Sequence, residues 1–66
     1  MELMSIRIRE LREKRGLTIS EVAKILEIPR QTYLRWEKGL AKRGLHILAK
    51  LANFFEVSAD YLLGFE

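Results

Sequence analysis

A chain of 66 residues that contains no cysteine has few ways to stabilise a fold. At this length, folding buries only about 60% of the surface that the unfolded chain exposes, so other sources of stability become important. The absence of cysteine excludes disulfides, and the single histidine, His46, cannot complete a tetrahedral zinc site. We therefore expect one domain over residues 1–66, without metal or cofactor, that is stabilised by helix packing or by dimerisation.

The apolar residues recur at helical spacing along the chain, and residues that end or cap helices separate the segments. Strict alternation of apolar and polar residues, which would indicate strands, is absent. Thr18 and Glu21 have the spacing of a capping box. The sequence predicts an all-α, compact five-helix bundle, with a first helix ending at Gly16 and a second beginning at about residue 18. A third helix is expected from Arg30 to Lys38, a fourth with apolar positions from Leu45 to Phe55, and a last short one capped by Ser58 and closed by Gly64.

Positive charge is concentrated in the first two thirds of the chain. Residues 1–43 contain eleven basic and six acidic residues, whereas residues 44–66 contain one basic and three acidic residues. Within residues 30–43, Glu37 is the only acid beside five bases. A basic stripe of this kind suits a polyphosphate partner such as nucleic acid, although a charged surface that only keeps the protein soluble is the alternative.

Residues 18–39 have the layout of two helices joined by a tight turn. Tyr33 and Trp36 are three residues apart, so both rings can pack inward from the second of these helices. This packing turns Arg30, Gln31, Leu34 and Arg35 outward. A helix-turn-helix presents such a helix to the major groove of DNA, where arginine matches guanine, glutamine matches adenine and an apolar side chain contacts the thymine methyl group. The alternative for Trp36 is that it stacks on a base.

The same segment, TISEVAKILEIPRQTYLRWEKG, resembles the helix-turn-helix of the Cro and phage-repressor family, also called the xenobiotic-response-element family. The resemblance continues into residues 8–17, 48–52 and 57–64, so it covers nearly the whole chain. It implies a lambda-repressor-like bundle of five helices that binds operator DNA, usually as a two-fold dimer, with the third helix in the major groove.

The resemblance also implies roles for individual residues. Arg30, Gln31 and Arg35 fall at base-reading positions, and Thr32 and Leu34 beside them are expected to contact a base or a phosphate. Arg12 is expected to form an ion pair with Glu37, the alternative being two solvated charges. The expected phosphate contacts, which set affinity without reading sequence, are Thr18, Lys38, Lys42 and Arg43.

Three positions differ from the common family pattern. Ile19 replaces a glutamine that contacts phosphate, although the backbone amides at the start of the helix can still serve. Glu27 replaces a glycine in the turn, where a positive φ would cost about 1 kcal/mol. After the third helix, Arg43 and Gly44 replace a Pro-Ser pair, which removes a side-chain cap from the fourth helix and adds a positive charge.

Some apolar residues near the C-terminus are expected to remain outside the core. Phe54, Leu63 and Phe65 do not all fit inside a bundle of this size, and exposed apolar residues indicate a partner surface. We interpret them as a dimer contact, with a frayed C-terminal segment as the alternative.

Together these features predict a cytoplasmic, sequence-specific regulator of transcription that binds double-stranded DNA. The expected activity is repression, by a homodimer on a palindromic operator, with no small-molecule effector. An antitoxin-like protein-interaction module is the alternative. An enzyme is not expected, because the carboxylates, three serines and one histidine are scattered, and no apolar run is long enough to span a membrane.

Overall fold

The computed structural model describes residues 3–39 and 44–65 of the chain. Within these ranges it contains five helices and no strand, which confirms the predicted all-α class. None of these helices has the length and apolar character needed to cross a membrane. In chain order, they are α1 (Leu3–Lys14), α2 (Ile19–Ile25), α3 (Arg30–Lys38), α4 (Leu45–Phe55) and α5 (Ala59–Leu63).

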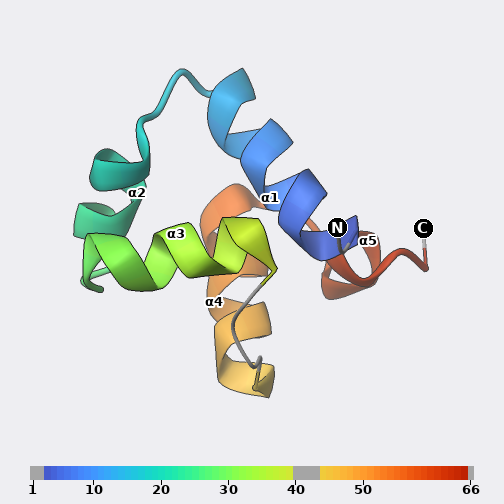
Figure 1. The fold of residues 1–66 in the computed structure, drawn as a ribbon. Coiled ribbons are helices and arrows are strands. Elements are labelled where there is room, and N and C mark those ends of the chain that lie inside the picture. Colours follow the sequence, from blue (N-terminus) through green and yellow to red (C-terminus); the bar gives the residue numbers. More distant parts are fainter. Residues whose placement is uncertain (1–2, 40–43, 66) are drawn as a thin grey trace.

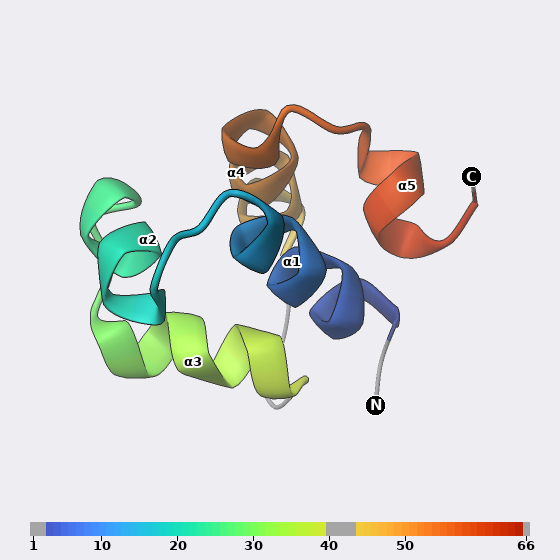
Figure 2. The ribbon, with the colours of Figure 1, turned by 90° about the horizontal axis from the view of Figure 1, so that it is seen from above.

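The helices are arranged around α1, which packs against α3, α4 and α5. Helices α2 and α3 pack on each other at one side of the molecule, and α5 lies at the opposite side (Figure 1). Seen from above, α3 runs along one outer edge of the molecule, and α1 and α2 lie on its other side (Figure 2). One long face of α3 is therefore left uncovered by the other described helices.

The core contains residues from all five helices. The side chains that are fully buried or nearly so are Ile8 of α1, Val22 of α2, Tyr33 of α3, Leu51 and Phe55 of α4, and Leu62 of α5. Trp36 is only 5% exposed, and its ring meets the edge of Tyr33 with 6.1 Å between ring centroids. Trp36 is therefore a core residue, and the alternative in which it stacks on a base is wrong.

Side chains form hydrogen bonds with free backbone amide and carbonyl groups at several helix ends. Thr18 and Glu21 form the predicted capping box at the start of α2, and Ser58 accepts a hydrogen bond from the Tyr61 amide at the start of α5. Arg15, just after α1, donates to the carbonyl groups of Phe54 and Phe55 at the end of α4, at 3.2 and 2.9 Å. Helical spacing alone did not predict this contact, by which a cation caps the negative end of another helix.

Glu27 occupies the turn between α2 and α3 with a backbone φ of 59°. Its amide donates to the Lys24 carbonyl, and the next amide, of Ile28, donates to the Ala23 carbonyl. This is the hydrogen-bond pattern of a Schellman motif, in which glycine is the common residue at positive φ. The turn therefore adopts the conformation typical of glycine although its residue is glutamate.

We expect Glu27→Gly to raise the free energy of unfolding by about 1 kcal/mol, because glycine adopts this φ without a Cβ clash. The matched control is Glu10→Gly, at an exposed position inside α1, which should lower stability by about 1 kcal/mol. Urea unfolding followed by circular dichroism measures both changes. Destabilisation of similar size in the two variants would show that Glu27 is not strained.

Candidate nucleic-acid interface

The two faces of α3 differ sharply in burial. Tyr33, Trp36 and Glu37 point inward and are buried. The other face follows residues 30, 31, 34, 35 and 38, a spacing that places side chains along one side of a helix. We call this set the outward face of α3: exposed Arg30, Gln31, Arg35 and Lys38, with half-buried Leu34.

The outward face of α3 carries three cations and no anion. The one acid of α3, Glu37, is 4% exposed and lies on the inward side. Within the described part of the chain, no three acidic, histidine or cysteine residues gather as they would around a metal ion. A convex helical face with cations and one amide suits a polyanion whose base edges accept and donate hydrogen bonds.

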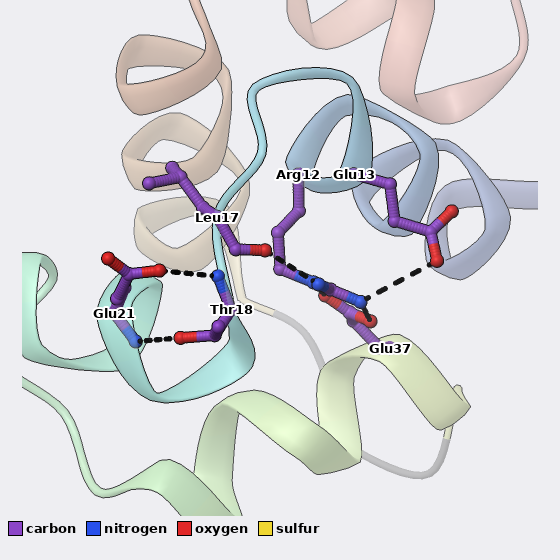
Figure 3. A network of polar contacts seen from close by, with 6 residues as sticks. All are labelled: Arg12, Glu13, Leu17, Thr18, Glu21 and Glu37. Carbon is purple, nitrogen blue, oxygen red and sulfur yellow. Dashed lines mark hydrogen bonds and ion pairs between the residues drawn. The ribbon is translucent and has the colours of Figure 1, made fainter.

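The expected ion pair between Arg12 and Glu37 is present, and its buried position excludes the alternative of two solvated charges (Figure 3). Arg12 donates through Nε to one carboxylate oxygen at 2.6 Å and through Nη2 to the other at 3.1 Å. The hydrogen bond with Glu37 is the main reason that the pKa of Arg12 is raised above its ordinary value. Such a bidentate pair fixes both distance and orientation between α1 and α3.

The same guanidinium also holds the connection between α1 and α2. Arg12 donates through Nη1 to the carbonyl oxygen of Leu17 at 2.8 Å, directly before the capping residue Thr18 (Figure 3). One side chain therefore fixes both the start of α2 and the far end of α3. This support for the two helices comes from inside the molecule.

Tyr33 supports α3 from inside. Burial raises the pKa of its hydroxyl, and the neighbouring carboxylate of Glu37 raises it further. Within the described residues, the hydroxyl has no hydrogen-bond partner of good geometry. The ring therefore stays neutral and serves in packing, which leaves polar recognition to the outward face of α3.

The start of α2 already contains an anion of the chain itself. The Glu21 carboxylate accepts a hydrogen bond from the Thr18 amide at 2.8 Å, and Thr18 Oγ1 accepts one from the Glu21 amide at 3.1 Å (Figure 3). These bonds with Thr18 lower the pKa of Glu21. Of the amides at this helix start, those of Thr18 and Glu21 are thus occupied, although the hydroxyl of Thr18 can still donate its proton.

Ser20 contacts Arg30, one of the predicted base-reading residues, and the sequence analysis did not predict this contact. Arg30 donates through Nε to the hydroxyl oxygen of Ser20 at 3.0 Å. The two residues are ten positions apart and belong to different helices, so only the crossing of α2 and α3 brings them together. Of the remaining predicted contacts, Thr32 is half-buried, while Lys42 and Arg43 lie outside the described residues.

The residues expected to form a dimer contact lie in two places. Leu63 and Phe65 are 47% and 78% exposed and flank Gly64, where an added Cβ would lie 2.6 Å from Leu3 at the start of α1. Phe54 is instead half-buried at the end of α4, where its ring packs against Phe55 with 4.8 Å between centroids. The apolar edge between α1 and α5 therefore consists of Leu3, Leu63 and Phe65, without a described contact to Phe54.

Comparison of the sequence with known proteins finds relatives that are named as regulators of transcription. The model of the helix-turn-helix family matches residues 8–62. The chain is 38% identical to the HTH-type transcriptional regulator AnsR of Bacillus subtilis over 60 residues, which cover 91% of the chain. It is 40% identical over 55 residues, or 83% of the chain, to the cryptic phage CTXphi transcriptional repressor RstR of Vibrio cholerae.

The relatives differ in length. The chain spans about half of AnsR and RstR, with 52% and 50% of their lengths covered. An uncharacterized HTH-type transcriptional regulator of Archaeoglobus fulgidus is matched over 90% of its own length and 96% of this chain, at 36% identity.

We expect Arg12→Met to lower the free energy of unfolding by roughly 3 kcal/mol, because it leaves the Glu37 carboxylate buried without its partner. The double variant Arg12→Met/Glu37→Leu removes both charges and should recover most of that loss. Thermal and denaturant unfolding at neutral pH provide the measurement. A double variant that is no more stable than Arg12→Met would contradict a specific buried pair.

Proposed function

Because the chain belongs to the helix-turn-helix family, we propose that it binds double-stranded DNA in a sequence-specific manner and represses transcription in the cytoplasm. The observation that carries the proposal is the outward face of α3. Its cations and amide are exposed, while the rings of the same helix are buried. The proposed mode of binding inserts α3 into the major groove, as the second helix of a helix-turn-helix does.

Arg30, Gln31 and Arg35 are the proposed base-reading residues. All three are exposed on the same face of α3, over its first two turns. A guanidinium offers paired donors to the acceptors of guanine, and an amide donates to and accepts from adenine. Leu34 lies between them, half-buried, where a thymine methyl group is the proposed contact. Thr32 is proposed to contact a base or a phosphate beside them.

The proposed phosphate contacts surround this face. Lys38 is exposed at the end of α3, and Thr18 is exposed at the start of α2 with its hydroxyl as the proposed donor. Lys42 and Arg43 are assigned the same role from the sequence. Contacts of this kind position the protein on the duplex and make its affinity depend on salt, but they do not select a sequence.

A homodimer on a palindromic site is the proposed assembly. Leu3 at the start of α1 and Leu63 and Phe65 around Gly64 are exposed apolar residues. They belong to the part of the chain around α5, which lies at the side of the molecule opposite α2 (Figure 1). Exposed apolar residues that gather in this way support a contact with a second copy. Two copies would place their α3 helices in successive major grooves, about 34–36 Å apart, and such a dimer would block access to a promoter.

We expect Arg30→Ala to lower affinity for a preferred duplex by about ten- to a hundredfold, because one bidentate base contact is worth about 1–3 kcal/mol. Binding to scrambled DNA should fall much less. Fluorescence anisotropy measures both, with the preferred duplex obtained by selection of bound sequences from random DNA.

Lys38→Ala is the control for Arg30→Ala, because it also removes one positive charge from the same helix. We expect it to weaken binding to both duplexes equally and to reduce the slope of log affinity against log salt by about one. Equal losses on both duplexes for the two variants would contradict base reading by Arg30.

We expect native protein to form dimers in sedimentation or light scattering, and Phe65→Ser to shift it toward monomers by removing exposed apolar area from the contact. Ile25→Ser is the control, because Ile25 is also exposed, at 56%, but belongs to α2. Native protein that stays monomeric at high concentration, with and without the selected duplex, would contradict the dimer.

A further inference from the structure

One of the three proposed base-reading side chains is held by another helix. Arg30 is the first residue of α3, and its Nε donates to the hydroxyl of Ser20, the second residue of α2, at 3.0 Å. Within the described residues, Gln31 and Arg35 form no such hydrogen bond or ion pair. Arg30 is therefore distinguished from its neighbours by a contact formed before any DNA is present.

This hydrogen bond limits how Arg30 can meet a base. A guanidinium has five N–H donors, one on Nε and two on each terminal nitrogen. Because Ser20 occupies Nε, the terminal nitrogens Nη1 and Nη2 are the pair left for a bidentate contact. The side chain is thus presented end-on, and a side chain already held in one conformation loses less entropy on binding.

We propose that Ser20 is a positioning residue for specificity: it holds Arg30 so that Nη1 and Nη2 together meet the two major-groove acceptors of a guanine. This inference rests on the proposed function, since it assigns a partner to one of its base-reading residues. Ser20 acts through Arg30 and needs no DNA contact of its own. Its hydroxyl oxygen is the required group, because only an acceptor can hold the Nε donor.

The alternative role for Ser20 is a direct contact with a phosphate, since its hydroxyl proton is available while its oxygen accepts from Arg30. The two roles predict different results. A phosphate contact contributes equally on every sequence and does not depend on Arg30. A positioning residue changes the preference at one base pair and loses its effect when Arg30 is removed.

The experiment uses the full chain and the duplex that native protein selects from random DNA. Each G·C pair of that duplex is replaced in turn by A·T, and Kd is measured for native protein and for Ser20→Ala, Ser20→Thr, Arg30→Ala and Ser20→Ala/Arg30→Ala. The pair at which Arg30→Ala abolishes the preference is the pair read by Arg30. Ser20 is exposed and helical, so alanine is compatible with the fold, and thermal unfolding verifies this.

We expect Ser20→Ala to reduce the preference at that pair by about two- to tenfold, the range for the loss of one hydrogen bond, and to leave the other pairs unchanged. Ser20→Thr keeps the hydroxyl and should therefore keep the preference of native protein at that pair. In the Arg30→Ala background, Ser20→Ala should have no further effect.

Two results would overturn the positioning role while the proposed function stands. One is an unchanged preference at every pair in Ser20→Ala. The other is an equal loss on all duplexes that persists in the Arg30→Ala background, which would assign Ser20 to a phosphate. If native protein selects no preferred duplex, the proposed function fails and the inference fails with it.

Discussion

The bidentate contact between Arg12 and Glu37 is the constraint on which the rest of this structure depends. A carboxylate that is only 4% exposed is costly unless a cation and further hydrogen bonds compensate it. Arg12 supplies both, and its third donor reaches the carbonyl of Leu17. Because one planar group makes all three contacts, α3 and the start of α2 cannot shift independently of α1. The two helices that are proposed to meet DNA are thus fixed from the inside.

This internal support separates two roles of α3, which are packing in the core on one face and contact with a partner on the other. Tyr33, Trp36 and Glu37 pack or pair in the interior, so the main support of the helix comes from its buried face. The exposed cations and amide can therefore be exchanged for other polar side chains at little cost in stability. A scaffold of this kind can acquire a new target sequence by surface changes, while the packing that orients the helix is kept.

The sequence predicted the helices well because each has a local signal. The glycines at 39 and 64 end helices in the left-handed conformation, and Thr18 and Ser58 cap the helices that follow them. The helical spacing of Tyr33 and Trp36 also predicted which face of α3 points outward. The pairing of Arg12 with Glu37 came from family resemblance, because a spacing of 25 residues carries no local signal.

Other contacts of the site could not be predicted in this way. The hydrogen bond of Arg30 to Ser20 depends on the angle at which α2 crosses α3. The half-buried position of Phe54, whose ring packs against Phe55, depends on how α4 packs in the bundle, while its predicted dimer contact with Leu63 and Phe65 stays a prediction. In both examples the missing information is the tertiary geometry, which residue types and spacing do not contain.

Two arginines, one within α1 and one directly after it, also link α1 to α4 and α5. Arg7 donates to the carbonyl of Tyr61 and lies over its ring, and Arg15 reaches the end of α4, 40 residues later. During synthesis on the ribosome, α1 can meet α3 first, but the part of its apolar side that packs on α4 and α5 stays without these partners until both helices have emerged. Completion of the core is therefore delayed until nearly the whole of residues 3–65 has been translated.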